Sequence, residues 1–280
     1  MQVRLRDHAL PWRLCAVPAV VASLVLAGCA ADVGSRPGQV PEIRPGVLAG
    51  YLPANARPDS LKLVPPPPAP DSAAQAADAE MARKQMALRG TARWQLAAAD
   101  AELRFPQAAG VFSCALGAPI SEQATPRLVL LLRRSLVDAG LSTYGAKDHY
   151  QRARPFVVNG QPICTPEDAD KLRKDGSYPS GHNAAGWAWA LILAELAPDR
   201  ADALFARGLA FGQSRLVCNV HWQSDALAGR TMGAAAVARL HADPVFLADM
   251  AAARQEIAAV RARGLPPSHD CAAEAAALAP

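Results

Sequence analysis

The feature that most constrains the fold is a series of helical segments after Asp71, with no alternating, strand-like run among them. Apolar residues recur at helical spacing, and Gly and Pro residues mark the segment ends. Alanine is abundant and β-branched runs are scarce, which also favours helix. The expected helices span residues 73–89, 92–103, 121–140, 183–196, 201–217, a stretch through 221 to 240, and 243–263. The pattern predicts an all-α, single-domain bundle of roughly seven to ten helices.

The rest of the composition excludes several classes of protein. No apolar stretch after Cys29 reaches eighteen uncharged residues, so we expect no transmembrane bundle. The net charge of +4 is mild and spread along the chain, which does not indicate nucleic-acid binding. An anionic small substrate is compatible with it.

The N-terminus is typical of an export signal. Three arginines precede residues 14–26, an apolar stretch too short for a stable membrane span. The stretch ends in L-A-G-C, which resembles a bacterial lipobox and implies cleavage before Cys29 and lipidation of its thiol. An ordinary signal peptide cut near Ala30 or Ala31 is the alternative.

The predicted organisation is a signal peptide over residues 1–28, a Pro-rich tether over 29–70 and the folded domain over 71–280. The tether ends in four prolines, so we expect extended chain and no helix there. Some of its apolar residues, among them Tyr51, Leu52, Leu61 and Leu63, are candidates to pack on the domain. By analogy with enterobacterial sorting, the residue after Cys29 favours an outer-membrane lipoprotein, with a soluble periplasmic protein as the alternative.

The first candidate site is S-R-L-V-C-N-V-H-W-Q-S-D, residues 214–225. On a helix, His221 and Asp225 would lie one turn apart on one face. A carboxylate there accepts the Nδ1–H of the imidazole and leaves Nε2 free as a nucleophile or base. Arg215 adds a fixed positive charge. Taken alone, the pair is more readily interpreted as a solvated or capping pair.

Two upstream segments carry further anion-binding chemistry. Lys147 and Arg154 lie seven residues apart, about two helical turns, and Pro155 follows them. The lysine offers a point charge and the arginine a planar, two-pronged donor for phosphate oxygens. Taken alone, the two residues indicate only a basic surface. In G-S-Y-P-S-G-H, Ser180, Gly181 and His182 stand at a helix start, where backbone N–H groups favour an anion. A capped helix with a surface histidine is the plain alternative.

Together the segments read K-x6-R-P, P-S-G-H and S-R-x5-H-x3-D. This resembles the three-part signature of the phosphatidic acid phosphatase type 2 (PAP2) superfamily, which includes vanadium haloperoxidases. The longer runs G-S-Y-P-S-G-H and G-Q-S-R resemble the class A bacterial non-specific acid phosphatases in particular. The resemblance covers residues 71–240 and implies the all-α fold of that superfamily.

The resemblance also implies a role for each site residue. His221 is the expected nucleophile, Asp225 orients it, and His182 protonates the leaving alkoxide and then activates water. The expected phosphate ligands are Lys147, Arg154, Arg215, Ser180 and the backbone N–H of Gly181. We therefore expect metal-independent hydrolysis of phosphate monoesters, without a cofactor, through a phosphohistidine. A neutral His221 and a protonated His182 predict an acidic pH optimum.

Outside the signal segment and Cys29, four cysteines remain: Cys114, Cys164, Cys218 and Cys271. In an oxidising compartment an even number suggests two disulfides, with three connectivities, while free buried cysteines are the alternative. We favour Cys164–Cys218, because both lie near candidate site segments, and Cys114–Cys271.

Three other functions stay open at this point. The first is a vanadate-dependent haloperoxidase, which the short chain and the G-S-Y-P-S-G-H context disfavour. The second is a hydrolase with a metal held by His221, Asp225 and His182, a poor donor set beside three cations. The third is a non-catalytic anion-binding lipoprotein. The sequence names no physiological substrate, and a homo-oligomer is expected only by analogy with relatives.

Overall fold

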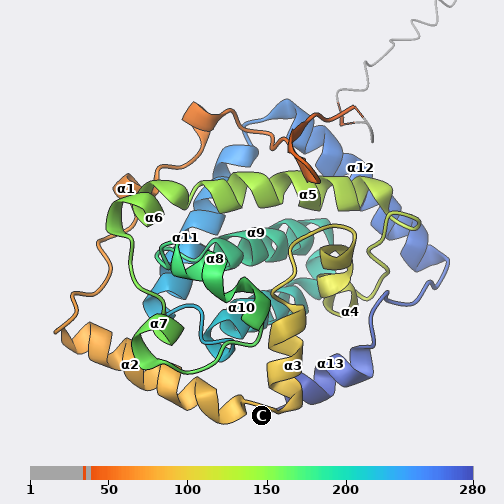
Figure 1. Ribbon diagram of the computed structural model, residues 1–280. Helices are drawn as coiled ribbons and strands as arrows, with labels where there is room; N and C mark the ends of the chain where they lie inside the picture. Colours follow the sequence, from red (N-terminus) through yellow and green to blue (C-terminus); the bar gives the residue numbers. More distant parts are fainter. Residues whose placement is uncertain (1–33, 36–38, 280) are drawn as a thin grey trace, which may run out of the picture. The chain divides into compact units, whose positions relative to one another are not determined.

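The computed structural model describes residues 34–35 and 39–279 (Figure 1). The predicted signal peptide and the lipidation site Cys29 lie outside the described residues. The α-helices are α1 (Ser60–Leu63), α2 (Ala73–Gln85), α3 (Ala92–Ala99), α4 (Ser113–Leu116), α5 (Pro126–Leu141), α6 (Tyr144–Tyr150), α7 (Pro155–Asn159), α8 (Ala169–Arg173), α9 (Gly181–Leu196), α10 (Ala201–Val217), α11 (Gln223–Leu240), α12 (Pro244–Ala262) and α13 (Cys271–Leu278). Short 3-10 helices span Ala54–Ala56, Met86–Leu88, Gln107–Phe112, Pro166–Asp168 and Pro198–Arg200.

The all-α prediction is confirmed. Within the described residues the strands are β1 (Glu42–Arg44) and β2 (Val47–Leu48), a small antiparallel hairpin that pairs Glu42 with Leu48 and Arg44 with Val47. In this part of the chain, no helix combines the length and apolar character needed to cross a membrane.

Helix α9 is the centre of the bundle (Figure 1). Its sequence is almost entirely apolar, and it packs against α5, α10 and α11. Trp189, Ile192 and Leu193 are fully enclosed. A helix that is apolar on every side is stable only when neighbours cover all of it, so the other long helices are arranged around α9.

Two glycines of α11 let its backbone approach that of α9. A Cβ at Gly229 would lie 2.4 Å from the carbonyl oxygen of Ser180, and one at Gly233 would lie 2.4 Å from that of Ala184. Both positions therefore require glycine. The approach brings the N-terminal ends of α9 and α11 together, and Ser180 N donates to the Asp225 carbonyl at 3.0 Å.

Several predicted helix boundaries are wrong. The helix expected from Ser121 begins at Pro126, because Thr125 folds back and its Oγ1 accepts from Ser121 N at 3.2 Å. The segment 243–263 is not the last helix, since α13 follows it. Helices α6, α7, α8 and α13 were not expected, because pieces of five to eight residues are too short to show a helical period.

Part of the predicted tether packs on the helices. The backbone N–H groups of Tyr51 and Leu52 donate to the Asp138 carboxylate at 2.7 and 3.2 Å, and the Tyr51 hydroxyl donates to Asp249 at 2.7 Å. Tyr51 and Leu52 are buried, whereas Leu61 and Leu63 are exposed. The expectation of no helix before residue 71 is wrong at α1, where Asp59 caps the turn by accepting from Leu61 N.

Both predicted disulfides are confirmed. Cys114–Cys271 joins α4 to α13, and Cys164–Cys218 joins the loop before α8 to the end of α10. The second bond lies immediately before the turn that carries His221.

Candidate active site

His221 was expected on a helix, but it lies in a turn between α10 and α11. The carbonyl oxygen of Arg215 accepts from the backbone N–H of His221 at 3.2 Å, which closes this turn. The left-handed backbone of Asn219 (φ 60°) lets the chain reverse, a conformation that asparagine tolerates. The imidazole is buried, with 3% of the side chain exposed.

Asp225 meets His221 through the capping geometry of α11. It occupies the third position of the helix, and its Oδ2 accepts from the Trp222 N–H at 2.8 Å, as the acidic member of a capping box does. The same oxygen lies 3.3 Å from His221 Nδ1. The spacing of four thus predicted the contact correctly, although a helix cap and not one helical face produces it.

Arg152 holds the other side of the Asp225 carboxylate. Its Nη1 donates to Asp225 Oδ1 at 2.5 Å and to Ser224 Oγ at 2.7 Å, and its Nη2 donates to Asp78 Oδ2 at 2.8 Å. Asp78, on α2, also accepts from the backbone N–H of Ser224 at 2.9 Å. Burial raises the pKa of Asp225, and Arg152 is the largest opposing influence. The Arg152 side chain is only 8% exposed, so it supports the site from within the fold.

Lys147 and Arg154 come together, but not on one helix. Gln151 ends α6 in a left-handed conformation, and Arg154 is extended because Pro155 follows it and begins α7. Lys147 Nζ lies 3.5 Å and Arg154 Nη2 2.8 Å from Asp175 Oδ2. Arg154 Nη1 lies 3.1 Å from His221 Nε2. The structure thus places Arg154 next to the nitrogen that the sequence predicts as the nucleophile, and Lys147 beside the carboxylate that Arg154 binds.

The P-S-G-H segment forms the first turn of α9. Ser180 is its N-cap, and the hydroxyl accepts from Asn183 N at 3.3 Å and Nδ2 at 3.1 Å. Those contacts leave the hydroxyl hydrogen available to an anion. The N–H of Gly181 lies in the helix turn whose donors lack intrahelical acceptors. His182 Nε2 lies 2.9 Å from the Ala101 carbonyl, an acceptor, which leaves Nδ1 to exchange a proton.

Arg215 completes the cluster from the last turn of α10. It is buried, and its Nε and Nη1 have no hydrogen-bond partner among the described residues. Burial and the nearby charge of Arg154 lower the pKa of Arg215 to about 10. An uncompensated buried guanidinium is costly, so its presence indicates a site built for an anion.

The cations and burial shift both histidines in one direction. Burial first, then the charges of Arg154, Lys147 and Arg215, lower the pKa of His221 well below its ordinary value. Burial and Arg215 do the same to His182. Burial and Arg154 lower the pKa of Lys147 to about 8. A neutral His221 fits the expected nucleophile, but His182 is also neutral in the free protein, which the sequence argument did not anticipate.

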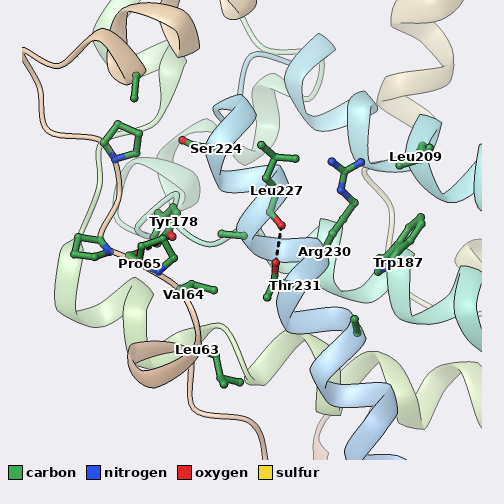
Figure 2. Close-up of a pocket in the computed structure, with 15 residues that line it drawn as sticks. Leu63, Val64, Pro65, Tyr178, Trp187, Leu209, Ser224, Leu227, Arg230 and Thr231 are labelled. Atoms are coloured by element: carbon green, nitrogen blue, oxygen red, sulfur yellow. Dashed lines mark hydrogen bonds between the residues drawn. The ribbon is translucent and has the colours of Figure 1, made fainter.

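Other features of the described surface give no second candidate. No three His, Cys, Asp or Glu side chains in the described part of the chain are grouped to hold a metal ion. A groove of about 970 Å³ runs beside α11, between the segment that carries Val64 and Pro65 and the side chains of Trp187 and Leu209 (Figure 2). It is mostly apolar and contains none of the predicted site residues.

Sequence reasoning missed Asp175 and Asp78. Asp175 stands just before the G-S-Y-P-S-G-H run, so the proximity of an acid to an anion-binding motif was the available signal. Asp78 gave no signal, because 146 residues separate it from Ser224.

Known proteins are similar to this chain over most of its length. The model of the PAP2 superfamily matches residues 128–246. The non-specific acid phosphatase of Providencia stuartii is 44% identical over 212 residues, covering 75% of this chain and 86% of that protein. That of Salmonella typhimurium is 45% identical over 195 residues (69% and 78%), and the acid phosphatase of Zymomonas mobilis is 42% identical over 203 residues (72% and 77%).

Among solved structures, a bacterial vanadium-dependent iodoperoxidase is similar with a TM-score of 0.47 and 17% identity, covering 72% of this chain and 62% of that one. The sequence relatives, matched over most of their length, decide the family. This chain belongs to the PAP2 superfamily, together with the bacterial non-specific acid phosphatases.

Proposed function

We propose that this protein is an acid phosphatase that hydrolyses phosphate monoesters to an alcohol and inorganic phosphate, without a metal ion, through a phosphohistidine on His221. The observation that carries the proposal is the buried cation cluster around an imidazole whose Nδ1 faces a carboxylate. The relatives named acid phosphatases support the same reaction.

The charges of the site suit a phosphoryl group. Lys147, Arg154 and Arg215 bind its non-bridging oxygens, with the Ser180 hydroxyl and the Gly181 N–H as neutral donors. Phosphoryl transfer spreads negative charge over those oxygens in the transition state, so fixed cations in a buried site stabilise it strongly. In this proposal three side-chain cations do the work that a metal ion does elsewhere.

The first step is an in-line attack. His221 Nε2 forms a bond to phosphorus, the phosphorus–oxygen bond of the ester breaks, and His182 gives a proton to the leaving alkoxide. Asp225 accepts from Nδ1–H and stabilises the positive charge that develops on the ring. In the second step His182 takes a proton from water, the water oxygen attacks phosphorus, and the phosphorus–nitrogen bond breaks.

The protonation of His182 depends on the substrate. Burial and Arg215 keep its pKa low in the free protein. Bound phosphate brings negative charge that opposes Arg215, so it raises the pKa of His182 in the complex. Low pH supplies the proton more readily, which supports an acidic optimum.

We also propose that the protein works in the periplasm, attached to the outer membrane through a lipid on Cys29. The signal-like N-terminus supports export, and two disulfides suit an oxidising compartment. Cys29→Ser in cells fed labelled palmitate tests the anchor. Label retained by the variant would contradict it.

The test of the function is hydrolysis of p-nitrophenyl phosphate across pH, with EDTA present, by wild type and by His221→Ala. His241→Ala is the matched control, because that histidine is exposed and lies at the end of α11. We expect a loss on the order of 10³-fold or more for His221→Ala and none for the control. Quenched wild type should carry acid-labile phosphate.

Each other outcome favours an alternative. Activity abolished by EDTA would favour a metal-dependent hydrolase. Inactivity of folded wild type with both disulfides intact would refute the proposal. The haloperoxidase and anion-binding alternatives would then be examined by bromide oxidation after vanadate loading and by phosphate binding.

A further inference from the structure

Asp175 forms ion pairs with two of the cations that bind phosphate in the proposed reaction. Its Oδ2 lies 2.8 Å from Arg154 Nη2 and 3.5 Å from Lys147 Nζ. The two cations are almost fully buried, whereas the Asp175 side chain is 32% exposed. We propose that Asp175 is a specificity-determining residue that competes with phosphate for these cations and thereby selects phosphate esters carrying one proton and one negative charge. This inference rests on the proposed function.

The competition follows from how Arg154 is bonded. Its Nε donates to the carbonyl oxygens of Leu172 and Asp175, both at 3.0 Å. Its Nη1 donates to the Val220 carbonyl at 3.0 Å and faces His221. The remaining amino group, Nη2, is the one that holds the Asp175 carboxylate. A phosphate oxygen that reaches this group must displace the carboxylate or lie against it.

The backbone beside Asp175 cannot move aside easily. A Cβ at Gly176 would lie 2.7 Å from the carbonyl oxygen of Lys147, so the chain is packed directly against α6 here. The carboxylate therefore yields by rotating into solvent, which its partial exposure allows, or it remains beside the phosphate.

A proton decides which of these two arrangements is favourable. Two unprotonated anions a few ångströms apart repel each other, and a shared proton turns the repulsion into a short, strong hydrogen bond. A phosphate monoester loses its second proton near pH 6, so the singly charged form predominates only in acid. Among the described residues, the charged and titratable groups near Asp175 are Arg154 and Lys147, with the phenol of Tyr144 on α6 and the imidazole of His221 on the other side of Arg154. None of these is a second carboxylate that would share the proton instead.

The proton that Asp175 shares with the ester is separate from the one that the leaving alkoxide requires. Burial and Arg215 lower the pKa of His182 in the free protein. His182 takes its proton from solvent when the negative charge of the bound ester raises that pKa, so low pH supplies both protons.

The experiment is calorimetric titration of the purified protein with inorganic phosphate, near neutral pH, where much of it is doubly charged, and at about pH 5, where almost all of it carries the second proton. Asp175→Asn keeps the shape and removes the charge, and Asp175→Ser is a second variant in case the amide makes new bonds. Asp170→Asn is the matched control, an exposed acid on the adjacent helix α8. Urea unfolding confirms that each variant is folded.

We expect Asp175→Asn and Asp175→Ser to bind phosphate on the order of tenfold tighter than wild type at neutral pH. The difference should shrink to about twofold or less at pH 5, where phosphate carries the proton. Asp170→Asn should match wild type at both pH values.

Weaker phosphate binding by both Asp175 variants at neutral pH would overturn the proposal, because it would mean that the carboxylate arranges the cations. An equal change at both pH values would overturn it as well. In either case wild type still binds phosphate and hydrolyses esters, so the proposed function stands. A folded wild type that neither binds phosphate nor hydrolyses esters refutes both.

Discussion

Replacing Arg215 by methionine should stabilise the protein while inactivating it. Arg207 and Arg215 lie eight residues apart on α10, and both are buried. Arg207 is fully paired, with Asp100 at 2.6 Å and Glu274 at 3.0 Å. Nε and Nη1 of Arg215 have no partner among the described residues. Comparing variants of the two arginines therefore distinguishes the free-energy cost of an unpaired buried charge from the contribution of a buried ion pair.

The magnitude follows from the pKa of Arg215, which burial and Arg154 lower from 12.5 to about 10. A cation whose pKa falls on folding destabilises the native state at every pH below the lowered value. The shift corresponds to ~3 kcal/mol at neutral pH. Methionine keeps much of the aliphatic stem and removes the charge. Allowing for imperfect packing, we expect Arg215→Met to raise the free energy of unfolding by about 1–3 kcal/mol.

The measurement is urea unfolding followed by circular dichroism, with the disulfides intact and no phosphate in the buffer. Phosphate must be absent because a ligand of the native state adds its own stability. Arg207→Met is the matched control and should lose about 3–5 kcal/mol, since it leaves buried carboxylates unpaired. The kcat/KM for p-nitrophenyl phosphate should fall on the order of 100-fold or more in Arg215→Met.

Added phosphate supplies an independent check. It should raise the unfolding midpoint of wild type and have little effect on Arg215→Met. Destabilisation of Arg215→Met by more than about 1 kcal/mol would refute the reasoning, because the guanidinium would then stabilise the free protein on balance. Unchanged kcat/KM would refute its role in binding the phosphoryl group.

Three further predictions concern stability. Arg152→Met should cost about 3–5 kcal/mol by leaving two buried carboxylates unpaired, less in acid, as urea unfolding at two pH values would show. Because the pKa values of His221 and His182 are lowered on folding, the free energy of unfolding should fall as pH drops through about 6.5, and less steeply in His182→Asn. A slope unchanged in that variant would contradict this. Replacing Cys114 and Cys271 by serine should cost at most about 5 kcal/mol, with kcat near the wild-type value.

The sequence predicted the long helices because their core-facing apolar residues recur at helical spacing. The helix expected over 243–263 begins where Asp243 caps α12 by accepting from Phe246 N at 2.9 Å. The site segments were predicted because each carries its chemistry within twelve residues or fewer, and local spacing is preserved on folding. The contact of His221 with Asp225 was correct for that reason, even though the turn before α11 is not helical.

Contacts between distant segments were beyond such reasoning. The carboxylate of Asp78 reaches Arg152 across 74 positions, and Tyr51 reaches Asp249 across 198. The first pair joins the segment after α6 to α2, and the second joins the N-terminal segment to α12, so each depends on how separate helices pack. Local pattern predicts neither the pairing of Arg152 nor the fact that Nε and Nη1 of Arg215 find no partner in the part of the chain that the structure describes.

The distribution of paired and unpaired charges carries the functional argument. Arg207 and Arg152 are buried with carboxylates close by, which satisfies their charge within the fold. Arg215 is buried with no carboxylate at ion-pair distance in the described part of the chain, and Asp175 satisfies Arg154 through a partly exposed side chain that can leave. A binding site that is electrostatically complete in the free protein would gain nothing from an anion. In this site the charge of Arg215 is not compensated, and that of Arg154 is compensated by a side chain that can move away. A bound phosphoryl group supplies the missing negative charge. The transition state, with charge spread over its oxygens, interacts with the cations most strongly.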